Sequence, residues 1–221
     1  MSLAWGADSG AVAGGGAASF VALTGEIAAR LRAGPPQAND RPWPGEPDAL
    51  VSALAKEPLR EAAVLVPLVL GESGASLLLT RRTSGLRHHS GQIAFPGGKI
   101  DPQDSSAAAA ALREAEEEIG IEAAQVTVLG YLDAHLSVSR FRVIPVVGAV
   151  AAPLRLRVNP AEVEEAFEVP LAFLMNPANH RLANLERDAK TRHFYEMTFG
   201  THRIWGVTAG IIRALAERIG R

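Results

Sequence analysis

The 221-residue chain predicts an α/β fold in which a mixed β-sheet lies between helices. Short apolar runs typical of strands recur along the chain, and the strongest helical segment lies between two groups of them. Hydrophobic residues make up 48% of the chain and charged residues 21%, which is enough apolar material for a core. The sequence therefore predicts one α/β sandwich with the element order β-β-α-β-β-β-α.

The N-terminal segment is expected to precede this domain. Residues 1–19 are rich in Gly and Ala, so we expect a flexible tail. Residues 20–33 place apolar side chains at helical spacing and predict a short helix, which ends at a Gly-Pro-Pro sequence. Residues 34–47 carry several prolines and predict an arm on the surface. We assign 1–47 to this tail, helix and arm, and 48–221 to the main domain.

The remaining elements follow from apolar runs and turn residues. Residues 48–58 predict a second short helix, and a Gly-containing turn predicts a hairpin of strands at 62–70 and 76–82. Residues 105–119 predict a strong helix with Gly120 as its C-cap. The elements expected after it are strands at 126–133 and 142–150, a short helix with a loop in 160–175, a hairpin of 193–199 and 202–205, and a final helix at 207–218.

Composition excludes several classes of protein. The 22 basic and 24 acidic residues give a net charge of −2, which argues against a nucleic-acid-binding body. The chain has no cysteine, so a disulfide, a zinc-thiolate site and a cysteine nucleophile are all excluded. The apolar runs are too short to span a membrane, and the N-terminus lacks the pattern of a signal peptide. We expect a cytoplasmic protein with neither a membrane nor a nucleic acid as partner.

Three glutamates of the predicted 105–119 helix point in similar directions. Relative to Glu114, Glu118 is rotated by about 40° and Glu117 by about 60° around the helix axis. Such like charges repel one another and also oppose the negative end of the helix dipole. The face is either a solvated acidic surface or a cation site, and oxygen ligands alone would favour Mg²⁺ or Mn²⁺.

A Gly-Gly turn ahead of the helix favours the cation site. Together, the turn and the helix resemble the Nudix box, G-x5-E-x7-R-E-U-x-E-E-x-G-U, in which U is a bulky aliphatic residue. The matching residues of the second half are Arg113, Glu114, Glu117, Glu118, Gly120 and Ile121.

The first half of the box departs from the pattern. Gly98 and Arg113 are separated by 14 residues instead of 13, and Asp104 stands where the box has its first glutamate. Ala115 is smaller than the usual aliphatic residue. We expect Asp104, or one of the two serines after it, to cap the helix.

The residues from 78 to 101, LLTRRTSGLRHHSGQIAFPGGKID, resemble a narrower signature. The coenzyme A pyrophosphatase branch of the Nudix hydrolases reads approximately LLTxRSxxLRxHxGQVxFPGGxxD. Thr83 replaces Ser and Ile93 replaces Val, and the box of this branch is also one residue longer. Weaker similarity extends the resemblance over roughly residues 50–215.

This resemblance implies a Nudix-type α/β/α sandwich that hydrolyses the diphosphate of coenzyme A to 3′,5′-ADP and 4′-phosphopantetheine. It implies Mg²⁺ or Mn²⁺ as cofactor, held by Glu114, Glu117 and Glu118, with Arg113 orienting a box glutamate. Glu114, Glu117 and Arg113 are thus the expected catalytic residues. The expected substrate-binding residues are Arg82, Arg87, His89, Gln92, Gly97 and Gly98.

Several alternatives stay open at this point. The substrate could be another nucleoside diphosphate derivative, such as ADP-ribose or NADH, or a nucleoside triphosphate. A nucleotide-binding module without catalysis is a further alternative, although an intact glutamate set argues against it. A general base could come from Glu162, Glu164 or Glu165. The oligomeric state is open, with a homodimer as one alternative.

Overall fold

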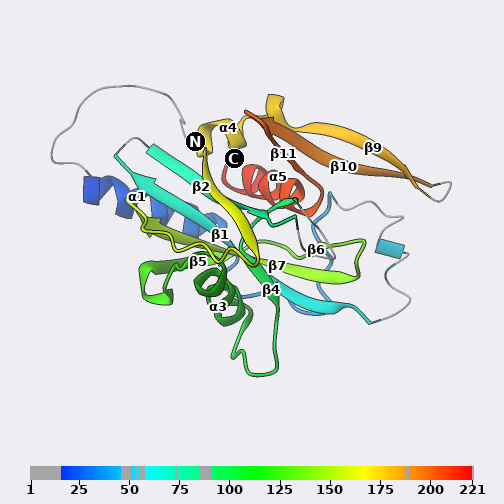
Figure 1. Ribbon diagram of the computed structural model, residues 1–221, viewed down its shortest axis with the longest axis horizontal. Helices are drawn as coiled ribbons and strands as arrows, with labels where there is room; N and C mark the ends of the chain where they lie inside the picture. The colour runs from blue at the N-terminus through cyan, green and yellow to red at the C-terminus, as the bar shows by residue number, and fades with distance from the viewer. Residues whose placement is uncertain are drawn as a thin grey trace.

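The computed structural model describes residues 16–45, 51–52, 54, 58–72, 74–84, 91–187 and 190–220. An eight-stranded mixed sheet forms the centre of this described part. Helix α3 (Ala107–Ile119) covers one face of the sheet, and α5 (Val207–Ile219) lies on the other side (Figure 1). The predicted α/β/α sandwich is therefore confirmed.

Two long strands form the middle of the large sheet. Strand β1 (Arg60–Gly71) runs parallel to β7 (Phe141–Ala151) over eleven paired positions. Strand β1 then turns back into β2 (Gly74–Arg82), which confirms the predicted hairpin. Strand β5 (Val126–Tyr131) pairs with the other side of β7. The sheet thus combines parallel and antiparallel pairs, as predicted.

Alternate side chains of β1 enter the two layers beside the sheet. Val66 and Leu68 belong to the core that includes α5, whereas Ala63 and Leu65 pack with Ala110 of α3. Successive side chains of a strand point to opposite faces, so β1 is buried on both sides. This burial explains why its sequence is almost continuously apolar.

Local capping signals define helix α3. The Ser106 hydroxyl oxygen accepts a hydrogen bond from the backbone N–H of Ala109 at 3.1 Å, and so caps the first turn. Gly120 ends the helix in the left-handed conformation, with φ of 72°. The helix predicted over 105–119 is confirmed, with its cap at Ser106.

The segment from 160 to 175 differs from the prediction of a short helix and a loop. It forms strand β8 (Val163–Pro170), which pairs with β2, and only α4 (Leu171–Met175) is helical. Three of the eight residues of β8 are glutamates, which are depleted in strands. Pairing with β2 outweighs this local preference.

Three short strands were also absent from the prediction. Strand β3 (Ile93–Ala94) pairs with β2, β4 (Gly97–Lys99) pairs with β1, and β6 (His135–Leu136) pairs with β7. Each is only two or three residues long, so no periodic pattern is available to detect it. Strand β4 is nevertheless important, because it pairs with β1 and also contacts α3 at Arg113 and Glu114.

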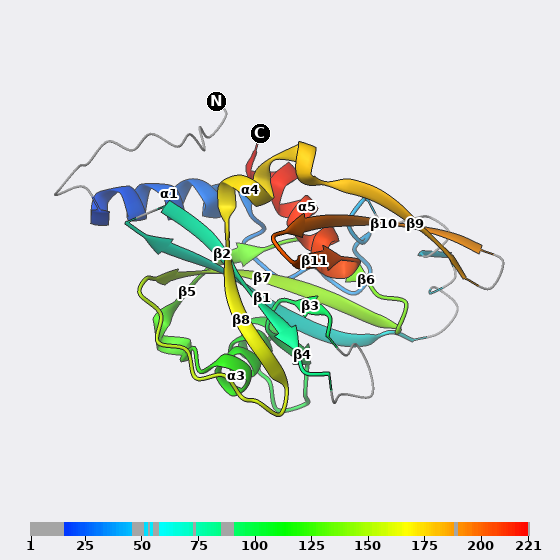
Figure 2. The same ribbon diagram turned by 45° about the horizontal axis from the view of Figure 1, so that its top comes forward.

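A three-stranded sheet extends away from the large one (Figures 1 and 2). It consists of β9 (Arg181–Arg187), β10 (Lys190–Phe199) and β11 (His202–Trp205). The predicted hairpin of β10 and β11 and the predicted helix α5 are confirmed, whereas β9 was not expected. Two short 3₁₀ helices, η1 (Ala123–Gln125) and η2 (Pro177–Asn179), complete the described elements.

The segment before β1 packs against the domain. Helix α1 (Gly16–Arg30) begins before its predicted start and ends three residues before its predicted end. The Arg142 guanidinium donates hydrogen bonds to the backbone oxygens of Pro36 and Gln37, and Trp43 is buried. The helix predicted at 48–58 lies mostly outside the described residues. No helix in the described part of the chain has the length and apolar character needed to span a membrane.

Candidate active site

The three glutamates of α3 differ in their exposure. The Glu118 side chain is 2% exposed and the Glu114 side chain 16%, whereas that of Glu117 is 55% exposed. Glu114 and Glu118 are one turn apart and face the sheet, and Glu117 lies at the border with solvent. The predicted acidic face therefore has a buried part and an exposed part.

Arg113 forms hydrogen bonds with several acidic residues of the site. Its guanidinium donates two hydrogen bonds to the Asp104 carboxylate, at 3.0 and 3.1 Å. It donates to Glu114 at 2.9 Å, to Glu117 at 3.2 Å and to the Lys99 backbone oxygen at 3.3 Å. The predicted pairing of this arginine with a box glutamate is confirmed by these contacts.

Asp104 occupies a supporting position beside this arginine. Its carboxylate also accepts a hydrogen bond from the backbone N–H of Asp101 at 2.8 Å. The hydrogen bonds from Arg113, followed by the one from Asp101, lower the pKa of Asp104. Asp104 therefore anchors Arg113 and closes the turn before α3, while Ser106 provides the helix cap.

Gly98 allows the backbone of β4 to lie directly against a box glutamate. A Cβ atom at this position would be 2.5 Å from the Glu114 carboxylate, so any other residue would displace this carboxylate. Burial raises the pKa of Glu114, and the hydrogen bond from Arg113 opposes this shift. Glu114 is thus held between a glycine backbone and a guanidinium.

Glu118 is the most deeply buried charged group of the site. Burial raises the pKa of its carboxyl to about 7, and the charges of Glu114 and Glu162 act in the same direction. The Arg82 guanidinium, 3.4 Å from Glu118 Oε1, lowers the pKa, as does a hydrogen bond from the backbone of Gly97. Negative charge is therefore concentrated here around a carboxyl with little access to water.

A fourth carboxylate, that of Glu162, reaches the same region from the loop before β8. Its charge acts on both Glu114 and Glu118, which requires it to lie near them. The Asn159 side-chain amide donates to Glu162 Oε1 at 3.4 Å, and the Thr83 backbone N–H donates to the Glu162 backbone oxygen at 3.0 Å. The loop thereby joins the end of β2 to the acidic cluster.

The other two glutamates considered as general bases face a different part of the molecule. Arg81 pairs with Glu165 at 2.5 Å and with Glu164 at 3.8 Å, and His202 also contacts Glu165, at 3.2 Å. Among these three glutamates, Glu162 is the one that the structure brings to the box residues. In the sequence, Glu162 is part of the short segment NPAEV.

Some of the residues expected to bind substrate are described by the structure, and others are not. Arg82 lies at the end of β2 next to Glu118, and its backbone N–H donates to the Gln92 backbone oxygen at 3.0 Å. Arg87 and His89 lie outside the described residues. Arg82 was expected to bind substrate, whereas in the structure its guanidinium contacts the carboxylate of Glu118.

Gly97 has a packing role in addition to its expected place at the substrate. A Cβ atom here would be 2.4 Å from the backbone oxygen of Ala63. Its positive φ of 156° also disfavours any other residue. The glycine pair therefore brings β4 close to β1 through Gly97 and close to α3 through Gly98.

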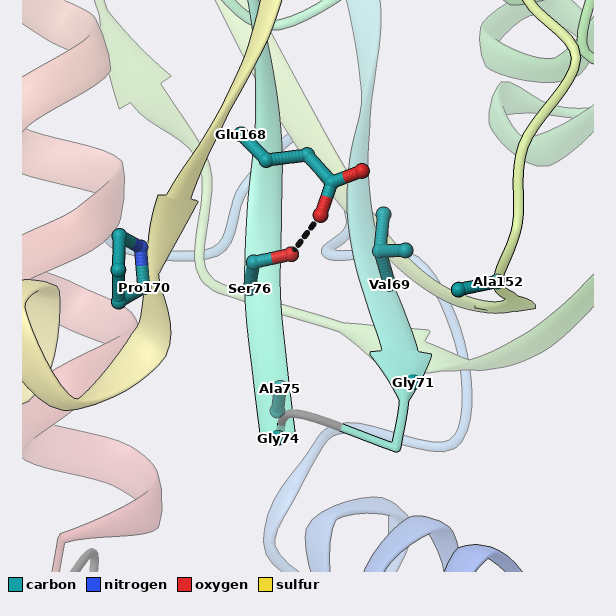
Figure 3. Close-up of a pocket in the computed structure, with 8 residues that line it drawn as sticks. All are labelled: Val69, Gly71, Gly74, Ala75, Ser76, Ala152, Glu168 and Pro170. Carbon is teal, nitrogen blue, oxygen red and sulfur yellow. Dashed lines mark hydrogen bonds between the residues drawn. The ribbon is translucent and has the colours of Figure 1, made fainter. Parts of the chain in front are cut away.

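A small pocket is present at the far end of the same hairpin, between the β1–β2 turn and β8 (Figure 3). Its polar feature is a hydrogen bond from the Ser76 hydroxyl to the Glu168 carboxylate. Ser76 precedes Arg82 by six residues of β2, a separation of roughly 20 Å along a strand. The pocket is thus distinct from the acidic cluster.

The family model described as the NUDIX domain matches residues 59–189 of the chain. The chain is 44% identical to the uncharacterized Nudix hydrolase NudL of Photorhabdus laumondii over 160 residues, which are 72% of this chain and 85% of the relative. Identity to the protein of the same description from Escherichia coli is 44%, over 73% of this chain and 83% of the relative. The chain belongs to the Nudix family.

A solved structure is also similar to this chain. The Nudix hydrolase from Alicyclobacillus acidocaldarius aligns with 75% of this chain and 94% of its own, at 18% sequence identity and a TM-score of 0.48. In the present protein the matched residues end at 189, whereas α5 lies beyond them and packs into the same core. The Nudix fold here thus includes elements on both sides of the matched segment.

The family membership makes this protein a Nudix pyrophosphohydrolase. Nudix hydrolases act on small-molecule nucleotide substrates and generally use divalent cations. Within the described residues, no three acidic or histidine side chains converge as ready metal ligands. Glu114 and Glu117 pair with Arg113 instead, and Glu118 faces Arg82.

Proposed function

We propose that this Nudix hydrolase cleaves the diphosphate of coenzyme A or its derivatives, with 3′,5′-ADP and 4′-phosphopantetheine as products. The observation that supports this substrate is the signature segment of residues 78–101. Its described parts form β2, β3 and β4, and they contact the box helix through Arg82 and Gly98. These contacts support the proposal that the segment selects the substrate at the acidic cluster.

The donor set fits a hard divalent cation, and we propose Mg²⁺ or Mn²⁺. The available ligands are carboxylate oxygens, from Glu114 and Glu118 with Glu117 at the edge. Gly98 leaves space at the Glu114 carboxylate that any Cβ atom would fill. Glu118 is a buried anion among other anions, so a cation would stabilise it. Bound there, the cation would polarise the diphosphate oxygens and offset their charge.

The protein side chains then have distinct parts in the hydrolysis. Water attacks one phosphorus and loses a proton to the surrounding solvent, the bond from that phosphorus to the bridging oxygen breaks, and the second phosphate leaves with that oxygen. Glu114, Glu117 and Glu118 would hold the cation, and Arg113 fixes the rotamers of Glu114 and Glu117 through hydrogen bonds to both carboxylates. The negative charge on the phosphate oxygens would thereby face a site whose side chains are already held in position.

Recognition of coenzyme A is assigned to the residues before the box. Its ribose 3′-phosphate is a third phosphate that ADP-ribose lacks, and the proposed cationic residues for this group are Arg87 and His89. Charge-assisted hydrogen bonds from arginine to phosphate are among the stronger ones. Gln92 and the backbone at Gly97 and Gly98 complete the proposed contacts.

The test is a product-resolved comparison of coenzyme A, dephospho-coenzyme A and ADP-ribose with Mg²⁺ and Mn²⁺. Coenzyme A should have the highest kcat/KM, about ten- to hundredfold above dephospho-coenzyme A, because one charge-assisted contact is lost. Arg87→Ala should reduce this gap. Arg155→Ala, which removes an exposed arginine from the loop before β8, is the matched control and should leave the gap unchanged.

A higher kcat/KM for ADP-ribose or a nucleoside triphosphate would reject coenzyme A as the substrate. Equal values for coenzyme A and dephospho-coenzyme A would reject recognition of the 3′-phosphate and leave selection to the pantetheine arm. Neither result would affect the assignment to the Nudix family.

A further inference from the structure

Two neighbouring arginines at the end of β2 point to opposite faces of the sheet. Leu78 packs with Ile119 on the α3 side, and Arg82 lies on this side four residues later. Leu79 belongs to the core on the α5 side, and Arg81 follows it two residues later. The strand therefore places the Arg82 guanidinium at the acidic cluster and the Arg81 guanidinium on the opposite face of the sheet.

The backbone of Arg82 is fixed by hydrogen bonds to the residues after the β2 end. Its backbone N–H donates to the Gln92 backbone oxygen, and its backbone oxygen accepts from the Gly91 N–H at 3.1 Å. The side chain is 26% exposed, and its tip lies 3.4 Å from Glu118 Oε1. This geometry places a permanent positive charge at the open side of a buried carboxylate.

Among the described residues, the other charged groups that act most strongly on Glu118 are negative. Glu114 and Glu162 both act on it as anions, and among the described ion pairs Arg82 is its cationic partner. A divalent ion that reached Glu118 would therefore meet the Arg82 charge at close range. Two positive groups sharing one carboxylate repel each other, and arginine cannot relieve this repulsion by losing a proton.

We propose that Arg82 is the protein's own counter-cation for Glu118, which competes with the divalent ion and is displaced towards the substrate diphosphate when that ion binds. This inference rests on the proposed cation site, and it gives Arg82 a second role beside substrate contact. When the ion binds Glu118, the Arg82 guanidinium loses this carboxylate as its partner, and its N–H groups can donate to the diphosphate instead. Cation binding and substrate binding are thereby coupled through one side chain.

The consequence can be measured without any substrate. Arg82→Gln removes the competing charge, so Mg²⁺ should bind the full-length protein at least about tenfold more tightly in isothermal titration calorimetry. The titration is done at pH 8.5, where Glu118 is ionised. Arg82→Lys keeps the positive charge and should retain an affinity close to that of the unaltered protein.

Arg81→Gln is the matched control. It removes the same charge from the adjacent position of the same strand, where the partners are Glu164 and Glu165. We expect its Mg²⁺ affinity to stay within about twofold of the unaltered protein, since surface charges at longer range are screened. Adding Glu118→Gln to Arg82→Gln should abolish the gain, because the carboxylate that Arg82 opposes is then neutral.

Equal Mg²⁺ affinities of Arg82→Gln and Arg81→Gln, or weaker binding by Arg82→Gln, would overturn the proposal. The unaltered protein offers a second measurement that does not depend on the folding of a variant. With ¹⁵N-labelled arginine, saturating Mg²⁺ should shift the Arg82 guanidinium signal, assigned through Arg82→Lys, and an unchanged signal would also overturn it. Both readouts lack substrate, so a failure of the coenzyme A assignment is detected separately.

Discussion

Two buried glutamates of this protein have opposite electrostatic surroundings. Glu196 on β10 is 9% exposed, and Arg203 donates to it at 2.6 and 2.8 Å while Arg181 lies 3.5 Å away. Glu118 on α3 is 2% exposed and faces Arg82 at 3.4 Å, with two further carboxylates nearby. The fold supplies an excess of positive charge to the first glutamate and an excess of negative charge to the second.

We interpret the difference as one between a structural charge at Glu196 and a proposed cation ligand at Glu118. A buried carboxylate with close guanidinium partners holds strands together, and its removal leaves those partners unsatisfied. An ionised buried carboxylate among other carboxylates raises the free energy of the folded protein, and a proton or a cation from outside can offset this cost. The same substitution, Glu to Gln, should therefore act in opposite ways at the two positions.

The largest expected effect is on turnover in Glu118→Gln. The change is nearly isosteric but removes one ligand charge from the proposed cation site. We expect kcat to fall at least about a hundredfold, which corresponds to about 2.7 kcal/mol. Without added metal, the free energy of unfolding should hold or rise, because a buried negative charge and its repulsions are gone.

Circular dichroism and a urea titration of the same sample supply the control for Glu118→Gln. Full activity in the variant would show that Glu118 holds no essential cation. Loss of the folded state would show that Glu118 is structural, like Glu196, and would break the contrast between the two sites.

The second expected effect is on the stability of Glu196→Gln. Loss of the charge weakens the hydrogen bonds from Arg203 and the ion pair with Arg181, although both arginine side chains are largely exposed to solvent. We expect the free energy of unfolding in urea to fall by about 1–2 kcal/mol, with kcat within about twofold of the unaltered protein. A more stable variant would contradict the structural reading of this site.

The third expected effect is a pH dependence of stability that belongs to Glu118. Its pKa is about 7 in the folded protein and ordinarily 4.5, so the folded state holds this proton more tightly. The resulting stabilisation is fully present below about pH 4.5 and is lost as the pH rises through about 7. In EDTA, the unaltered protein should lose about 1–2 kcal/mol relative to Glu118→Gln between pH 5 and 8. Parallel curves for the two proteins would contradict the burial of an uncompensated carboxyl.

The helix that carries the glutamates was predictable because its signals are local. Ser106, the alanine run after it and Gly120 specify the start, the body and the end of α3 within a few residues of sequence. The spacing of Glu114 and Glu118 on this helix follows from its geometry alone. Their unequal exposure depends on the sheet and was not predictable from the helix.

The contacts from other elements depend on tertiary pairing. Arg82 and Glu118 are 36 positions apart, and their ion pair exists because β2 ends beside the last turn of α3. Glu162 reaches the cluster because β8 pairs with β2, and the glutamates of β8 conceal that strand in the sequence. Local patterns thus identified the box, while the pairing of distant strands determined what surrounds it.

The most direct test of the central claim is the position of a bound cation. A crystal of the unaltered protein soaked with Mn²⁺ should show anomalous density about 2.0–2.4 Å from carboxylate oxygens of both Glu114 and Glu118. This result would place the cation on the face of α3 where the protein leaves negative charge in excess. Mn²⁺ bound only at other positions, with these two carboxylates still paired to Arg113 and Arg82, would contradict the account.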